Sequence, residues 1–153
     1  MKIRTYEISD TKKIVKLFYD TVHEVNIRDY TKAQVDAWAP GATDIQNWRQ
    51  SSSSKFTFVA VEGDTIAGFG ELERNGHIDR FYSHKDFQRQ GVGRLILKQI
   101  ESKAKDLGIN KLFTEASITA RPFFESQGFM VIRKQEVERR GQKFINFPME
   151  KNI

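Results

Sequence analysis

The feature that most constrains the fold is a glycine turn between a strand-like run and the most regular helical pattern of the chain. The turn, QRQGVG at 88–93, follows an alternating run from His77 to Ser83 and opens a helical face that ends at Leu107. Backbone amides at a helix N-terminus lack partners inside the helix, and glycines leave them open to a ligand. Such a turn suits an anion, most often a phosphate, although an ordinary strand-to-helix turn also uses glycine for tight geometry.

Strand patterns surround this turn. Strands are predicted over residues 56–62, 66–73, 77–83 and 111–116. The Gly63-Asp64 and Asn75-Gly76 turns join the first three into an antiparallel meander. A helix from Val92 to Leu107, closed by Gly108, then connects the third strand to the fourth. A strand, helix and strand in this order form a crossover, which predicts one parallel strand pair inside an otherwise antiparallel sheet.

The two ends of the chain complete an α+β pattern. A strand is predicted from Lys2 to Glu7, and helices over 11–25, 31–39 and 45–49. The serines at 51–54 are read as a polar loop. After the strand over 111–116, a short helix is predicted over 119–127, and a hairpin over 129–139 and 143–150.

Composition limits the classes of protein that this chain can belong to. Its 153 residues are 39% hydrophobic and 29% charged, which suits one globular domain spanning 1–153. No apolar run is long enough for a membrane span, and the polar start does not resemble a signal peptide. The lack of cysteine excludes disulfides and thiolate chemistry and favours a cytoplasmic location. A net charge of +5 favours acidic partners, either nucleic acid or a polyphosphate cofactor.

The flanking residues choose among phosphate-binding motifs. A P-loop needs Lys-Ser/Thr after its second glycine, and a dinucleotide fingerprint needs a small residue where Ile96 stands, so both are rejected. What remains is Gln-x-x-Gly-x-Gly preceded by FYSHKD at 81–86, with a second block, ARPFFESQGF, at 120–129. In order and separation these two blocks resemble the GNAT superfamily of acetyl-CoA-dependent N-acetyltransferases.

This resemblance implies a three-layer α/β/α fold and acetyl-CoA as the co-substrate, with no metal. Backbone amides of the turn would hold the cofactor pyrophosphate, and the strand before the turn would pair with the pantetheine arm. The implied cofactor-binding residues are Phe81, Tyr82, Ser83, Gln88, Arg89, Gln90, Gly91, Val92, Gly93, Arg94 and Phe124.

Catalysis is where the sequence departs from the family pattern. Phe124 occupies a position where many members carry a tyrosine that protonates the departing CoA thiolate. Holding a thiol as thiolate at pH 7 costs only about 2 kcal/mol, whereas deprotonating a lysine-like amine costs about 4.6 kcal/mol. For an aliphatic amine acceptor, a base or a proton-carrying water chain is therefore needed more than an acid.

Three residues are candidates for the catalytic chemistry. Glu71 could act as the base, although an exposed strand carboxylate is also consistent with its position. Tyr82 could donate or orient through its hydroxyl, or be a core aromatic with a polar tip. Ser117 could contact the thioester or cap the helix that begins near Thr119.

The segment from His23 to Trp38 is predicted to select the acceptor. It is rich in aromatic and polar-tipped groups, of which His23, Asn26, Tyr30 and Trp38 are the candidate substrate contacts. Satisfied core residues, and a helix-face histidine with a hydrogen bond, are the alternative readings. The three histidines show no ligand spacing with carboxylates, so no metal site is expected.

Three functional hypotheses follow. The leading one is an N-acetyltransferase that moves an acetyl group from acetyl-CoA to a primary amine, on a small molecule or a peptide, by direct attack. The second is a CoA-binding regulatory or inactive module, which Phe124 motivates. The third is a basic nucleic-acid-binding domain, but the chain lacks an aromatic-basic strand motif or a reading helix. Neither a nucleic-acid nor a membrane partner is expected, and the protein is expected to be a monomer or a homodimer.

Overall fold

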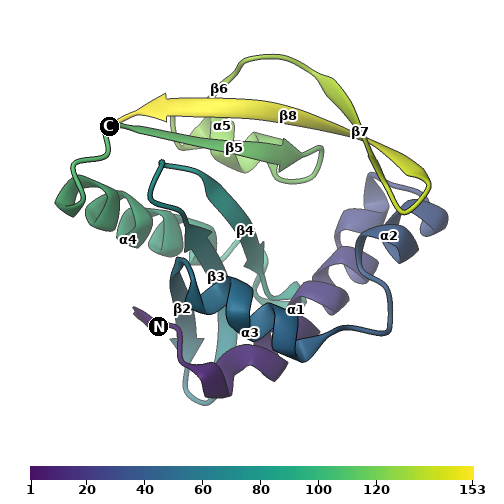
Figure 1. Ribbon diagram of the computed structural model, residues 1–153, viewed down its shortest axis with the longest axis horizontal. Coiled ribbons are helices and arrows are strands. Elements are labelled where there is room, and N and C mark those ends of the chain that lie inside the picture. The colour runs from purple at the N-terminus through teal and green to yellow at the C-terminus, as the bar shows by residue number, and fades with distance from the viewer.

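Two four-stranded sheets form the centre of the protein (Figure 1), seen in a computed structural model that describes all 153 residues. The first sheet has the order β1-β2-β3-β4, formed by β1 (Lys2–Thr5), β2 (Phe56–Glu62), β3 (Thr65–Leu72) and β4 (Ile78–Ser83). The second has β8 (Gln142–Asn152) in its middle, paired with β5 (Lys111–Ser117), β6 (Met130–Val131) and β7 (Gln135–Arg139). Every pairing within the two sheets is antiparallel.

The sheets join at a single parallel bridge, between His77 and Phe113. The Phe113 amide donates to the Gly76 carbonyl at 3.1 Å, and Thr114 Oγ1 donates to the Ile78 carbonyl at 2.9 Å. Beyond this point β4 and β5 share no further bridge, and they diverge in Figure 1. The predicted mostly antiparallel fold with one parallel strand pair is confirmed, and the pair is limited to its first residues.

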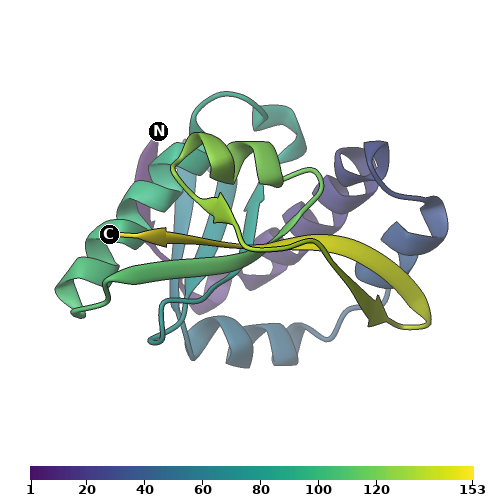
Figure 2. The ribbon, with the colours of Figure 1, turned by 90° about the horizontal axis from the view of Figure 1, so that it is seen from above.

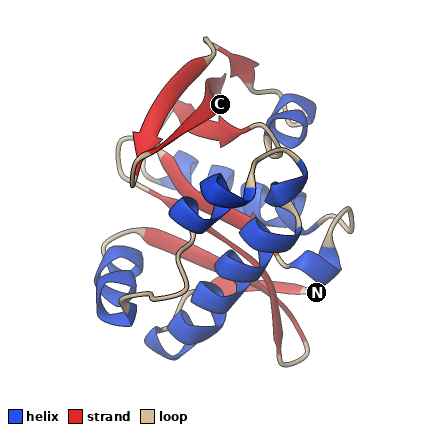
Figure 3. Cartoon of the chain, turned by 90° about the vertical axis from the view of Figure 1, so that its right-hand side faces the viewer, coloured by secondary structure: helices blue, strands red, loops and turns tan.

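Helices cover both faces of the first sheet, which confirms the three α/β/α layers (Figure 3). On one face, α1 (Thr11–Glu24) and α3 (Ile45–Ser53) pack against Phe69, whose ring centroid lies 6.2 Å from that of Trp48. On the other face lies α4 (Val92–Asp106). A Cβ on Gly70 would lie 2.7 Å from Cγ2 of Ile96, so this glycine is what lets α4 approach the sheet so closely.

Two shorter helices, α2 (Lys32–Trp38) and α5 (Arg121–Ser126), complete the fold. The hairpin of β7 and β8 reaches over to α2, and Figures 1 and 2 both show its tip beside that helix. Arg140 donates to the Ala37 carbonyl at 2.5 Å, and Gln34 Nε2 donates to the Lys143 carbonyl at 2.7 Å. None of the helices combines the length and the apolar character that crossing a membrane requires.

Two local predictions were wrong. The serine run was read as a loop, but α3 continues to Ser53, because Ser52 turns inward and its hydroxyl donates to Glu71 Oε2 at 2.8 Å. The predicted strand over 129–139 is split into β6 and β7. The break lies opposite Pro148, which has no amide to continue the ladder, although its carbonyl still accepts from the Ile132 amide at 2.8 Å.

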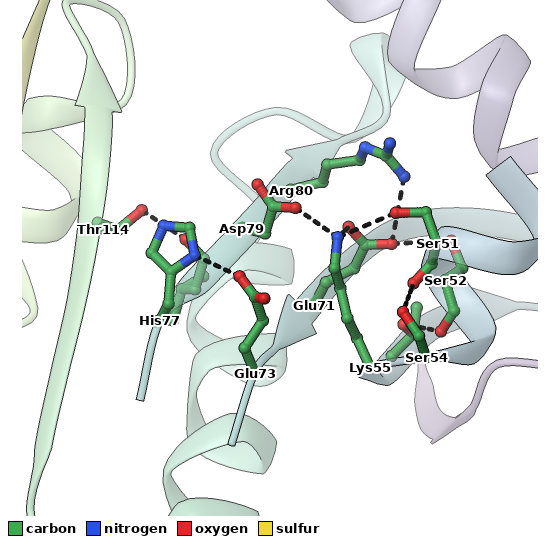
Figure 4. Close-up of polar contacts among 12 residues, drawn as sticks. Ser51, Ser52, Ser54, Lys55, Glu71, Glu73, His77, Asp79, Arg80 and Thr114 are labelled. Carbon is green, nitrogen blue, oxygen red and sulfur yellow. Dashed lines mark hydrogen bonds and ion pairs between the residues drawn. The ribbon is translucent and has the colours of Figure 1, made fainter. Parts of the chain in front are cut away.

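His77 connects the two sheets through its side chain as well. Its Nδ1 lies 2.5 Å from Oε1 of Glu73, just after β3 (Figure 4), and its Nε2 lies 2.8 Å from Oε1 of Glu115 on β5. Burial disfavours the charged ring, but the hydrogen bonds to the two carboxylates outweigh it and raise the pKa of His77. A protonated His77 therefore stabilises the junction from which the sheets diverge.

This raised pKa predicts a pH-dependent stability. The stabilisation should be complete below the unfolded-state pKa of about 6.5 and be lost as pH rises through the higher folded-state pKa. We expect His77→Gln to lower the free energy of unfolding by about 1–2 kcal/mol at low pH and much less at high pH. Thermal unfolding of both proteins between about pH 5.5 and pH 9 measures this. A difference that stays constant over that range would contradict the account.

Candidate active site

A cleft of about 1890 Å³ opens where β4 and β5 diverge. Its first half is lined by the end of β4, the glycine turn, the segment after β5 and α5. The other half, which we call the acceptor half, is lined by aromatic and polar side chains from the N-terminal helices, β4 and the β7–β8 hairpin. Its members include Phe18, Asn26, Tyr30, Trp38, Trp48, Tyr82 and Phe144.

The glycine turn presents unpaired backbone at the first half of the cleft. Gly91 is the N-cap of α4 with φ of +82°, and no side chain caps the helix. A Cβ at this position would meet no atom within 4 Å, so the turn is open on that side. At Gly93, by contrast, a Cβ would lie 3.0 Å from the Phe123 ring, so the turn packs closely on α5. The first amides of α4 are thus free to bind an anion.

Gln88 fixes the turn to the end of β4. Its Nε2 donates to the carbonyls of Ser83 at 2.9 Å and His84 at 3.2 Å. Because β4 pairs only with β3 along most of its length, its edge toward β5 has no strand partner. An extended ligand could pair with this edge as an added strand does.

Tyr82 lies between the two halves of the cleft. Its hydroxyl accepts a hydrogen bond from Trp38 Nε1 at 3.2 Å. Burial raises the pKa of Tyr82 strongly, against the opposing effects of the Trp38 hydrogen bond and of the positive charges of Arg139 and Arg80. The hydroxyl therefore keeps its proton at physiological pH and can donate a hydrogen bond.

Phe124 and Ser117 have local packing roles in addition to lining the cleft. Phe124 is 2% exposed, and its ring centroid lies 5.3 Å from that of Phe81 and 5.1 Å from that of Phe129. The Ala120 amide donates to Ser117 Oγ at 3.0 Å, just before α5 begins. This bond lies in the turn before α5, whose N-cap is Ala120 and which has no side-chain cap, so Ser117 does not cap the helix; its own hydroxyl proton is not used in the bond.

Glu71 does not line the cleft, and its carboxylate lies among Ser52, Lys55 and Arg80 (Figure 4). The side chain is fully buried, on the same face of β3 as Phe69, under α3. Its Oε1 lies 3.8 Å from Lys55 Nζ and its Oε2 lies 3.6 Å from an Arg80 guanidinium nitrogen. Burial raises the pKa of Glu71 despite these two cations. The expected exposed strand carboxylate is thus a buried one, and it could contact a substrate only through intervening groups.

Of the four residues predicted to contact the acceptor, Asn26, Tyr30 and Trp38 line the cleft and His23 does not. His23 Nε2 lies 2.7 Å from the Ala39 carbonyl, and the ring stacks on Tyr19. The expectation for His23 is corrected: its ring fastens α1 to the end of α2.

The Tyr30 hydroxyl both accepts and donates a hydrogen bond. The oxygen accepts from the Ile118 amide at 2.9 Å, and the hydroxyl donates to the Ile145 carbonyl at 2.9 Å. These bonds tie the N-terminal helices to the segment after β5 and to β8. Tyr30 is thus a structural wall of the acceptor half.

Sequence reasoning missed two cleft residues of note. The Arg80 guanidinium lies 3.7 Å from the centre of the Trp48 ring, and Asn146 has a buried Oδ1 without a hydrogen-bond partner. Arg80 precedes Tyr82 by two residues, so strand alternation places both on one face of β4. Asn146 is a lone amide in the apolar run FINFPM, and this is the signal that could have revealed it.

The family model and the curated relative that match this chain both describe acetyltransferases. Residues 26–153 match the family model of the acetyltransferase (GNAT) domain. The uncharacterized N-acetyltransferase YafP of Escherichia coli (strain K12) is 31% identical over 150 residues, which cover 97% of this chain and 94% of the relative.

Solved structures show the same fold. A GCN5-related N-acetyltransferase from Rhodopseudomonas palustris superposes with a TM-score of 0.95 at 27% identity, over 99% of this chain and 95% of that one. The PaiA N-acetyltransferase from Thermoplasma acidophilum, solved in complex with coenzyme A, superposes with a TM-score of 0.81 at 17% identity, over 99% and 98% of the two chains.

A variant that lacks the Tyr30 hydroxyl tests how the acceptor half is held together. Tyr30→Phe should lower the free energy of unfolding by about 1–3 kcal/mol, because the Ile118 amide loses its partner inside the protein. Urea unfolding measures this difference. Tyr19→Phe is the matched control, since Tyr19 is 37% exposed and its variant should unfold like the wild type. Equal stability of the two variants would contradict the assignment.

Proposed function

The chain belongs to the GNAT family of acetyltransferases, and on that premise we propose that it transfers an acetyl group from acetyl-CoA to a primary amine by direct attack. The observation that carries this proposal is the uncapped glycine turn at the mouth of the diverging strands. There an anion-binding helix end and an unpaired strand edge lie together, and a nucleotide pyrophosphate with an extended arm needs both.

The cofactor would lie along β4 and the glycine turn. Backbone amides from Arg89 to Arg94 would receive the pyrophosphate, and the edge at Phe81, Tyr82 and Ser83 would pair with the pantetheine arm. Gln90 supports the turn by donating from Nε2 to the Asp86 carbonyl at 3.3 Å. Phe124 would form the apolar wall behind the thioester. The coenzyme A bound to the PaiA relative supports this choice of cofactor.

The proposed reaction removes one proton from the amine and relies on two hydrogen-bond donors at the thioester. The amine nitrogen attacks the thioester carbonyl, a C–N bond forms, the C–S bond breaks, and the thiolate leaves. The Tyr82 hydroxyl, which stays protonated and faces the cleft, would donate a hydrogen bond to the departing thiolate, which would take its proton from solvent after release. Ser117 would donate a hydrogen bond from its hydroxyl to the thioester oxygen.

Removal of the amine proton is the harder step. We propose Glu71 as its final acceptor, because burial raises the pKa of this carboxyl toward the range that a base requires at neutral pH. Asp79 lines the cleft, but the Lys55 ammonium holds the pKa of Asp79 low in spite of burial. Since Arg80 separates Glu71 from the cleft, the proton must pass through intervening groups rather than by direct contact.

Cofactor binding is tested by a matched pair of glycine variants at the two ends of α4. Gly91 and Gly108 both have positive φ and open space around a Cβ, so alanine should strain either position by about 1–2 kcal/mol. We expect Gly91→Ala to weaken acetyl-CoA binding about tenfold or more, because the added methyl group faces the proposed phosphate site, while Gly108→Ala binds normally. Titration calorimetry with acetyl-CoA measures both. Equal affinities would contradict the placement of the cofactor.

The proton acceptor is tested by Glu71→Gln. If Glu71 is the base, the variant should lose about 100-fold in kcat/KM, and the acid limb of its pH profile should disappear, while Asp79→Asn keeps that limb. Steady-state release of CoA thiol across the pH range measures this. An unchanged acid limb together with a lower Tm would show that Glu71 is structural only. Acetyl-CoA binding without thiol release for any amine would favour the CoA-binding module instead.

A further inference from the structure

The charged side chains of the acceptor half differ in how far their hydrogen-bonding capacity is already occupied. The carboxylates that line it are Asp29, Asp44, Asp79 and Glu138, and the cations are Arg28, Arg80, Arg139 and Arg140. A further carboxylate that lines the cleft, Glu115 on β5, is hydrogen-bonded to His77 at the junction of the sheets. No lysine or histidine lines the cleft. The formal charges of the acceptor half balance, so the contacts of each group decide which sign of substrate the cleft can accept.

The carboxylates are already engaged or turned away. Asp79 pairs with Lys55, and Asp29 Oδ2 accepts from Thr119 Oγ1 at 2.8 Å. Asp44 caps α3 by accepting from the amides of Gln46 at 3.0 Å and Asn47 at 3.2 Å.

Glu138 is the remaining acid. It pairs with Lys143 across the hairpin and lies between Val137 and Arg139 in β7. Because side chains alternate along a strand, the Glu138 side chain is directed away from that of Arg139, although the residue borders the cleft. The other carboxylates of the acceptor half already accept hydrogen bonds or ion pairs, so Glu138 alone is left for a second positive charge.

The arginines, by contrast, have capacity left. Arg80 has only the distant Glu71 as an ion-pair partner, and one of its buried guanidinium nitrogens makes no hydrogen bond. Its guanidinium carbon lies over the Trp48 ring, 3.7 Å from the ring centre. Arg140 uses one guanidinium nitrogen on the Ala37 carbonyl, which anchors the hairpin next to Arg139. A carboxylate could match the free edges of such guanidinium groups.

Arg80 and Arg139 approach Tyr82 from opposite sheets. Arg139 shares its hairpin face with Phe144, which packs on Trp38 with ring centroids 6.0 Å apart, and Trp38 in turn bonds Tyr82. Arg80, Arg139 and Tyr82 all line the cleft, and the positive charges of both arginines lower the pKa of the Tyr82 hydroxyl. Two guanidinium groups and one hydroxyl thus belong to the acceptor half.

We propose that the acceptor is an amine that also carries a carboxylate, and that this carboxylate binds between Arg80 and Arg139 beside the Tyr82 hydroxyl. The inference rests on the proposed acetyl transfer and adds the substrate class. The aromatic side chains around the site would hold the carbon skeleton between the two polar groups. Diamines and polyamines would be poor acceptors, because their second cation would meet the arginines.

The test is thiol release from acetyl-CoA with amines matched in length and differing in charge. One set is 4-aminobutyrate, butylamine and putrescine, and a second is phenylalanine and phenethylamine. We expect the carboxylate-bearing member of each set to have a kcat/KM at least about tenfold higher, as lost hydrogen bonds to a charged group imply. Arg139→Gln should raise the KM for 4-aminobutyrate and phenylalanine at least about tenfold more than the KM for butylamine and phenethylamine.

Arg133→Gln is the control, because Arg133 lies outside the cleft and contacts only Gln135. It should keep the preference of the wild type. Preference for putrescine or for the neutral amines, or an equal loss for every amine in Arg139→Gln, would overturn the inference and leave acetyl transfer standing. If no amine supports thiol release although acetyl-CoA raises the Tm of the protein, acetyl transfer itself is overturned, and the substrate class with it.

Discussion

The divergence of β4 and β5 after one parallel bridge is the constraint on which the rest of the structure depends. The bridge at His77 and Phe113 holds the sheets together at one end, and α4 connects the two strands across the sheet. Because Gly70 lets α4 lie close to β3, the N-terminus of the helix is directed to the place where the strands separate. An unpaired strand edge and unpaired helix amides therefore occur side by side, and both need a ligand or water.

The two halves of the cleft are built by different physical means. The glycine turn and the β4 edge offer backbone groups, which recognise a common cofactor whatever the surrounding side chains are. The acceptor half depends on side chains from three separate parts of the chain, held together by Tyr30 and by the hairpin contacts to α2. Beside the acceptor half, Lys55 offsets part of the negative charge of the buried Glu71 carboxylate. Arg80, which also lies near Glu71, can therefore still bind a ligand in the cleft.

How far the sequence predicted this structure depends on whether each signal is local. The meander, the crossover and the glycine turn follow from short patterns in the chain, and so they could be predicted. The continuation of α3 through the serines could not, because it depends on Glu71, which is distant in the sequence. The same holds for Arg139, whose place in the cleft follows from the hairpin register and from the contact of the hairpin with α2.

The claim that the diverging strands form the cofactor site is tested most directly by amide chemical shifts in the isotopically labelled protein. On addition of coenzyme A, the account predicts that the largest changes occur at the amides of the β4 edge and the glycine turn, including Ser83, Gly91 and Gly93. Small changes are expected for β1 and for the tip of the β7–β8 hairpin. Large shifts confined to those distant regions, with Gly91 and Gly93 unchanged at saturation, would contradict it.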